Sequence, residues 1–353
     1  MKLDFLTLYP EAFGLDVSDR SFKIAKLKKT RNGYQLSSFG EFPLPEGLIA
    51  QGEIQNEDEV ARLLKEAVRS LKLQTPFVVS SLPEEKAFLQ VLQLPKMKEA
   101  EVKQAVLFEA ENYIPYSIDT VYLDSMYVPP LKNSLDHMDV LLAALPKSVV
   151  DSYVNCFRKA GLTARVLEIE SMATARALVA DETAEAPLLL LDMGATRTGF
   201  AVFAGTSLRF TASIPVSGSQ LTRALASALS VSEEEAEELK KTQGIQESLF
   251  PLLQELLNQV KKYVGYYESH SSHQHLQKEE KRIRKLLLAG GGANLKGLAE
   301  FFQKELEVPV EIGNPWVNIF KKEQKELPPL PLDQSLQYTT ALGLALRGMK
   351  SHD

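Results

Sequence analysis

The chain has 353 residues, of which 44% are hydrophobic and 24% charged, values typical of a soluble globular protein. At roughly 100 to 200 residues per domain, this length indicates two or three domains. The 40 Lys and Arg against 46 Asp and Glu give a net charge of −6, which disfavours nucleic acid as a partner, and the single cysteine, Cys156, excludes an internal disulfide.

Strand-like and helix-like patterns alternate along the chain, which predicts an α/β fold. Asn56 with Glu59 resembles a capping box ahead of a helical apolar stripe, and Ser232 with Glu235 opens a second helix that Gly244 would end. Extended segments rich in aliphatic or aromatic residues are predicted at 76–80, 88–92, 121–128, 140–144 and 188–191.

Two segments, 13–27 and 190–203, share one plan. In each, an apolar strand ends in an aspartate (Asp16 or Asp192), a short turn of small and polar residues follows, and an alternating strand comes next. Because the two aspartates lie half a chain length apart, the pattern predicts two halves built alike around a shared cleft. Such turns present N–H groups and hydroxyls to a phosphate, and an aspartate beneath each could hold Mg²⁺ through water.

A third segment, 284–298, reads as a strand, a glycine loop and a helix whose N-terminus could receive an anion or a nucleotide. It is not a P-loop, because Leu298 follows Gly297, and it is not a G-x-G-x-x-G motif, because Leu295 takes the last glycine position. Each of the three segments alone fits a plain connection between elements, but together they favour a nucleotide site.

The order of these motifs resembles a known superfamily. Asp16-Val-Ser-Asp-Arg-Ser, Asp192-Met-Gly-Ala-Thr-Arg-Thr and Leu288-Ala-Gly-Gly-Gly-Ala are similar to the phosphate 1, phosphate 2 and adenosine motifs of actin, Hsp70 and FtsA. Within that superfamily, segments 108–115, 167–171, 214–222, 235–240 and 338–345 extend the resemblance almost end to end to the PilM family of type IV pilus assembly proteins.

This resemblance implies an actin-like, ribonuclease H-like fold of duplicated domains, with subdomains 1A, 1C, 2A and 2B around a nucleotide cleft. Subdomain 1A is expected at 1–41, 140–187 and 331–353, and 1C at 42–139. Subdomain 2A is expected at 188–216 and 285–330, and 2B at 217–284.

The resemblance also implies ATP and Mg²⁺ as cofactors. The first turn would contribute Asp16, Ser18, Asp19, Arg20, Ser21 and Lys23, and the second Asp192, Gly194, Ala195, Thr196, Arg197 and Thr198. Gly290, Gly291, Gly292 and Ala293 would meet the adenosine, with Glu237 and Lys240 near the ribose and base. Asp16 and Asp192 would hold Mg²⁺ through water, and Glu170 would orient a water near the γ-phosphate. At most a weak ATPase activity is expected.

The first turn departs from the family pattern. Ser18 stands where relatives usually have glycine, and its Cβ falls where positive φ or close approach to phosphate is expected. Asp19 adds a negative charge that would repel phosphate, and Arg20 is expected to compensate by pairing with Asp19 or with the phosphate.

The resemblance implies that the groove between 1A and 1C binds the cytoplasmic tail of a PilN-like inner-membrane protein. Pilus assembly and retraction ATPases and the platform protein are further expected partners. The groove candidates are Phe108, Tyr113, Ile114 and Tyr116, for which core packing is the default alternative. No apolar run approaches the roughly 20 residues of a membrane span, so we expect no direct insertion and a cytoplasmic location at the inner face of the membrane through partners.

Two rival functions stay open from the sequence. A nucleotide-free structural relative, similar to the type II secretion protein GspL, would explain the altered first turn. A small-molecule kinase of the actin superfamily would need an acceptor pocket with a catalytic aspartate, and no residue pattern indicates one. An FtsA-like division protein is disfavoured, since that family ends in a membrane-binding amphipathic helix and residues 347–353 are short and polar.

Overall fold

Two five-stranded sheets with the same topology form the centre of the protein. The computed structural model describes residues 11–30, 33–130, 136–270, 281–320 and 328–349. The first sheet has the order β10-β6-β1-β2-β3 and the second the order β13-β12-β11-β14-β15. In each, the first three strands along the chain are antiparallel neighbours, and two further strands pair in parallel beside the first of them. The internal repeat predicted from the sequence is therefore confirmed.

The strands of the first sheet are β1 (Ala12–Val17), β2 (Ser21–Thr30), β3 (Gly33–Pro43), β6 (Phe77–Leu82) and β10 (Thr163–Ile169). Those of the second sheet are β11 (Ala184–Met193), β12 (Thr198–Gly205), β13 (Ser207–Ile214), β14 (Lys285–Ala289) and β15 (Val310–Ile312). Asp16 is the penultimate residue of β1 and Asp192 the penultimate residue of β11. The repeat thus delivers one carboxylate to the same end of the central strand in each sheet.

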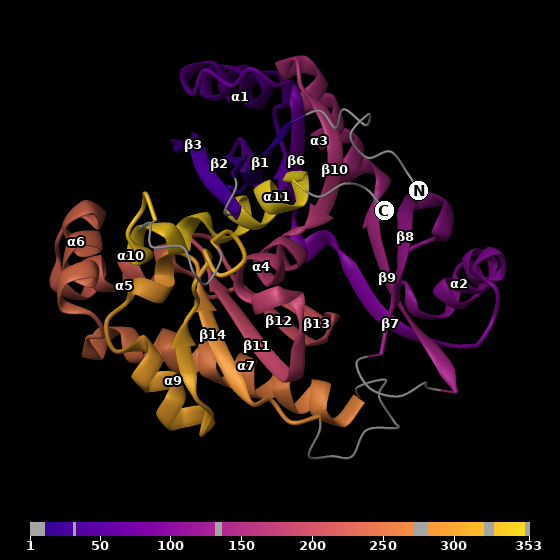
Figure 1. Ribbon diagram of the computed structural model, residues 1–353. Coiled ribbons are helices and arrows are strands. Elements are labelled where there is room, and N and C mark those ends of the chain that lie inside the picture. Colours follow the sequence, from indigo (N-terminus) through magenta and orange to yellow (C-terminus); the bar gives the residue numbers. More distant parts are fainter. Residues whose placement is uncertain (1–10, 31–32, 131–135, 271–280, 321–327, 350–353) are drawn as a thin grey trace.

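Helices cover both sheets, and two of them lie between the sheets (Figure 1). The helices of these two sheet units are α1 (Glu57–Ser70), α3 (Lys147–Ala160), α4 (Glu170–Leu178), α5 (Gly218–Leu229), α6 (Glu233–Gln243), α7 (Phe250–His270), α9 (Leu298–Leu306), α10 (Leu332–Ser335) and α11 (Thr339–Met349). The predicted caps are present: Asn56 and Ser232 accept from the amides of Glu59 and Glu235, and Gly244 ends α6 with φ +79°. Within the described residues, no helix combines the length and apolar character that a membrane crossing requires.

A smaller unit of β7 (Phe88–Pro95), β8 (Val121–Val128), β9 (His137–Pro146) and α2 (Glu99–Tyr113) lies to the right in Figure 1. Its sheet has the order β7-β9-β8 and its own apolar core under α2. The expected 1C range of 42–139 also holds α1, β6 and the short hairpin of β4 (Ile49–Ala50) and β5 (Glu53–Ile54). Within this range, β6 is hydrogen-bonded to β1 and β10 of the first sheet.

Helix α4 crosses α11 at backbone distance. A Cβ added to Gly343 of α11 would lie 1.9 Å from the carbonyl oxygen of Ala173 in α4. On the other side of α11, a Cβ at Gly14 of β1 would lie 2.3 Å from the carbonyl oxygen of Ala341. Helix α11 therefore packs against both β1 and α4 at a spacing that only glycine allows.

We expect Gly343→Ala to lower the free energy of unfolding by about 3 kcal/mol, because its methyl group meets backbone that cannot move aside. The matched control is Gly265→Ala in α7, where a Cβ has nothing within 4 Å. That change should raise the free energy of unfolding by about 0.5–1 kcal/mol through helix propensity. Urea unfolding monitored by circular dichroism measures both values, and equal effects at the two positions would contradict the close crossing.

Candidate functional site

A cavity of about 1010 Å³ lies between the two halves. The β1–β2 turn, the residues after β6 and the start of α4 line it from the first half. The β11–β12 turn, α5, α6 and the loop after β14 line it from the second half. Among the residues that the sequence predicted, the cavity is lined by Asp16, Ser18, Asp19, Lys23, Glu170, Asp192, Gly194, Ala195, Thr196, Arg197, Glu237, Lys240, Gly290, Gly291 and Gly292.

Four of the predicted residues do not line this cavity. Arg20 points to Glu46, with 3.2 Å between its guanidinium and the carboxylate. The buried hydroxyl of Ser21 donates to Glu41, and that of Thr198 donates to the carbonyl of Val216. Ala293 is buried in the core of the second half. These residues shape the walls around the cavity.

The first turn is closed by its own side chains. The Ser18 hydroxyl donates to the carbonyl of Ser21 over 3.0 Å and accepts from the Ser21 amide over 3.2 Å. Ser18 does not have positive φ, so the expected backbone conflict at this position is absent. The serine fits the turn that the family pattern assigns to glycine.

Asp19 and Arg20 do not pair with each other, so one of the two pairings expected for Arg20 is wrong. Asp19 accepts from the amides of Gln51 and Gly52, at 3.1 and 3.0 Å. Its cationic partner is Arg197 of the second turn, 3.4 Å away. The reason is the fold, since the β4–β5 hairpin and the other half supply donors that no local sequence pattern reveals.

The two aspartates at the strand ends are both harder to ionise than an ordinary aspartate. Desolvation raises the pKa of Asp16, and Lys23 and a hydrogen bond from Ser81 oppose the rise. Desolvation, and then the charge of Asp16, raises the pKa of Asp192 to about 6. The hydroxyl of Thr174 lies 3.2 Å from the Asp192 carboxylate. The cavity thus places two interacting carboxylates at its centre.

Three glutamates add to this acidic wall. Desolvation and the charges of Asp16 and Glu85 raise the pKa of Glu170 well above its ordinary value. Glu84 is buried and accepts from the amide of Ser171, and desolvation raises its pKa as well. Glu85 pairs with Arg197 at 2.6 Å. Glu84 and Glu85 were missed from the sequence, because no recognisable motif surrounds them.

The glycine loop after β14 approaches the second aspartate as closely as a backbone can. Gly290 has φ +77°, and a Cβ there would lie 2.4 Å from the Asp192 carboxylate. A Cβ at Gly292 would lie 2.5 Å from the Met193 side chain. The loop backbone therefore lies directly against the strand end, an arrangement that suits close approach of a phosphate.

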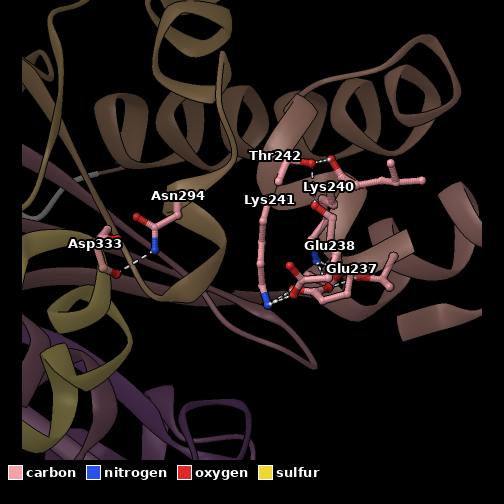
Figure 2. A network of polar contacts seen from close by, with 10 residues as sticks. Glu237, Glu238, Lys240, Lys241, Thr242, Asn294 and Asp333 are labelled. Carbon is pink, nitrogen blue, oxygen red and sulfur yellow. Dashed lines mark hydrogen bonds and ion pairs between the residues drawn. The ribbon is translucent and has the colours of Figure 1, made fainter. Parts of the chain in front are cut away.

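Helix α6 closes the far side of the cavity through a polar network (Figure 2). The Lys240 ammonium pairs with Glu237 and donates to the carbonyl of Gly218 over 3.1 Å, which fixes α6 on α5. On the facing loop, the Asn294 amide donates to the carbonyl of Asp333 over 2.8 Å. Lys240 therefore holds the wall in position as well as lining it.

The residues expected in the partner groove separate into two groups. Phe108 is 73% exposed, and Tyr113 and Tyr116 are also exposed. Ile114 is 7% exposed and packs in the core under α2, so it is not available to a partner. Of these four residues, only Ile114 packs in the core rather than facing outward.

A family model and a solved complex point to one family. The family model described as type IV pilus assembly protein PilM matches residues 14–349. A solved PilM-PilN type IV pilus biogenesis complex contains a chain 28% identical to this one, with a TM-score of 0.81, covering 98% of this chain and all of that one.

More distant structures share the fold. MreB5 of Spiroplasma citri bound to AMPPNP is 12% identical with a TM-score of 0.55, and covers 96% of each chain. The ethanolamine utilization protein EutJ from Carboxydothermus hydrogenoformans is 15% identical with a TM-score of 0.52, covering 96% of this chain and 90% of that one. Both likenesses support the actin-like fold.

Two curated relatives are cell division proteins FtsA. The protein from Pseudomonas aeruginosa is 26% identical over 216 residues, 55% of this chain and 50% of the relative. The protein from Borreliella burgdorferi is 28% identical over 124 residues, 33% of this chain and 30% of the relative. The chain thus spans half or less of the length of these relatives.

We expect Asp192→Asn to stabilise the protein at neutral pH. The folded state keeps the Asp192 proton up to a pKa of about 6, against 3.8 for an ordinary aspartate, so wild-type stability falls as pH rises through this window. Asparagine cannot ionise, and its amide oxygen still accepts hydrogen bonds. The stability gain should be about 1 kcal/mol larger at pH 7.5 than at pH 5.

Urea unfolding at the two pH values measures this difference. The control is Asp124→Asn on β8, which makes the same chemical change at an exposed carboxylate. A gain from Asp192→Asn that does not change with pH would show that Asp192 has an ordinary pKa.

Proposed function

The chain belongs to the PilM family of type IV pilus assembly proteins, and on this premise we propose that it is an actin-like scaffold that binds ATP with Mg²⁺ between its two halves. The observation that carries the proposal is the pair of turns at equivalent strand ends, one from each half, around one cavity. The proposed site is a nucleotide clamp rather than a site for a metabolic reaction.

The cavity fits a nucleotide in size and in lining. Ligand sites commonly have volumes of about 300–1,000 Å³, and this one has about 1010 Å³. The backbones of Gly290 and Gly292 lie too close to Asp192 and Met193 for any side chain. A loop without side chains lets a nucleotide approach its backbone closely. Distant relatives of the same fold support the proposal, since MreB5 has been solved with ADP and with AMPPNP.

The charges of the cavity call for a cation together with the nucleotide. Asp16, Asp192 and Glu170 all have raised pKa values, so an entering polyphosphate would meet an already unfavourable negative field. Mg²⁺, held by the phosphates and through water by Asp16 and Asp192, would offset that field. Within the described residues, no three His, Cys, Asp or Glu side chains are arranged to hold a metal directly.

Turnover would be slow at best. Desolvation and the charges of Asp16 and Glu85 raise the pKa of Glu170 well above its ordinary value, which disfavours the ionised carboxylate. A protonated carboxyl cannot accept a proton from an attacking water, although it can donate a hydrogen bond that orients one. We therefore propose a weak ATPase in which the bound nucleotide mainly determines how far the two halves close on each other.

The partner proposal is the cytoplasmic tail of a PilN-like protein, which would hold this protein at the inner face of the cytoplasmic membrane. The likeness to the chain in the PilM-PilN complex supports it. Pilus ATPases and the platform protein are further proposed partners. The tail is proposed to bind in a groove between 1A and 1C, bordered by exposed Phe108, Tyr113 and Tyr116.

A second surface on the described residues competes with the first. Helix α3 and β10, an outer strand of the first sheet, form a groove of about 460 Å³. It is lined by apolar Val154, Leu162 and Val166 together with Arg158 and Arg165. An extended tail with apolar side chains would suit such a sheet edge.

We predict that the wild type binds Mg-ATP saturably and that Thr196→Glu weakens binding by about tenfold or more, because the new carboxylate lies in the second turn and repels phosphate. Isothermal titration calorimetry measures the affinity. Thr163→Glu is the matched control for the change in charge, since Thr163 is exposed at the start of β10 and lies outside the nucleotide cavity.

Equal affinities for Thr196→Glu and Thr163→Glu would contradict a phosphate site at the second turn. A wild type that binds no nucleotide would instead support the rival that resembles GspL, a structural relative without nucleotide. Phosphate transfer from ATP to a small molecule would favour the kinase alternative.

Phe108→Ser and Val154→Ser separate the two candidate surfaces. Truncating the side chain that contacts the tail should lower the affinity for the tail about tenfold, as it does for buried interface anchors. We expect that loss for Phe108→Ser. Fluorescence anisotropy of a labelled peptide with the tail sequence of the PilN-like protein from the same genome gives the affinity.

Leu229→Ser is the control, since Leu229 is 44% exposed on α5, away from both surfaces. A loss confined to Val154→Ser would move the site to the α3–β10 groove. Unchanged binding in all three variants would overturn both surfaces.

A further inference from the structure

One arginine joins the two phosphate turns across the cavity. Arg197, from the β11–β12 turn of the second half, lies 3.4 Å from Asp19 and 2.6 Å from Glu85. Asp19 belongs to the β1–β2 turn and Glu85 follows β6, so both carboxylates come from the first half. The three side chains are partly buried, with 14–19% of each exposed. An ion pair between the halves at this depth is screened little by water.

The Asp19 carboxylate is fixed before any ligand arrives. Its two oxygens accept from the amides of Gly52 and Gln51 at the tip of the β4–β5 hairpin. The Gly52 carbonyl in turn accepts from the buried Tyr153 hydroxyl over 3.0 Å. A Cβ at Gly52 would lie 2.3 Å from Pro83, so the hairpin tip cannot shift inward. Asp19 is therefore a positioned negative charge.

This charge lies in the first phosphate turn, and its partner Arg197 lies in the second. Gly290 lies directly against Asp192 in the second half, whereas Asp19, Gly52 and Glu85 line the cavity from the first half. A nucleotide whose adenosine lies at the glycine loop would direct its last phosphate toward Asp19 and Arg197. The guanidinium that this phosphate needs is already paired with two carboxylates.

We propose that Asp19 and Arg197 form a latch that a terminal phosphate must displace, so that the cleft discriminates against nucleoside triphosphate relative to diphosphate at this pair. The inference rests on the proposed nucleotide site. A triphosphate must draw Arg197 away from Asp19 and then lie beside the fixed carboxylate, which repels it. A diphosphate is one phosphate shorter and leaves the latch closed.

Asp19→Asn tests the latch most directly, because asparagine removes the charge and keeps one oxygen that can accept from a hairpin amide. The expected result by calorimetry is an affinity for Mg-ATP about tenfold higher than that of the wild type. The affinity for Mg-ADP should change by less than about twofold. Asp124→Asn is the control and should change neither affinity.

An unchanged or lower affinity for Mg-ATP in Asp19→Asn would overturn the latch, and so would an equal gain for both nucleotides. Those results require that nucleotide binds, so they leave the proposed site intact. If neither wild type nor Asp19→Asn binds either nucleotide, the proposed site itself fails and the latch as a phosphate discriminator fails with it.

A second readout needs no nucleotide. In Arg197→Gln the two turns lose their ion pair, and amide hydrogen exchange at 18–21 and 49–54 should become several-fold faster than in the wild type. Thr163→Gln, outside the cavity, should leave these rates unchanged. Unaltered exchange in Arg197→Gln would show that the pair does not hold the halves together, and would overturn the latch.

Discussion

The structure depends on one electrostatic constraint: two partly buried aspartates, Asp16 and Asp192, face a common cavity from the ends of equivalent strands. Desolvation raises the pKa of both, and the charge of Asp16 adds to the rise for Asp192. Each also has a hydroxyl donor of its own, Ser81 for Asp16 and Thr174 for Asp192. The duplicated sheet topology creates this arrangement, because the same strand carries its aspartate at the same place in both halves. A cavity with this charge favours a cation that arrives together with an anion.

Three cationic side chains that line the cavity already have carboxylate partners. Lys23 pairs with Glu41, Lys240 with Glu237, and Arg197 with Asp19 and Glu85. Ligand binding here is therefore an exchange of partners rather than the filling of a vacant positive pocket. Because Arg197 belongs to one half and its partners to the other, such an exchange also changes what holds the halves together. Under the proposed function, this exchange would link the chemistry of the cavity to the surface presented to a partner protein.

Local patterns predicted the parts of the fold that local chemistry determines. The helix caps at Asn56 and Ser232 and the paired strand-turn-strand segments were recognisable because side chain and backbone interact within a few residues. The pairing of Asp19 with Arg197 was not, since the two residues meet only after both sheets have formed. The burial of Glu84 was also not predictable locally, because it comes from packing between the halves. Nor was that of Ile114, whose neighbours lie on β7, β8 and β9.

Hydrogen-deuterium exchange with and without Mg-ATP tests the central claim, that both halves together form one nucleotide site. The account predicts slower exchange at 17–21 in the first turn, at 194–198 in the second, and at 290–294 in the glycine loop, with no change in α1. Exchange that is unchanged at all three segments, or slowed in one half alone, would contradict a site clasped between the halves.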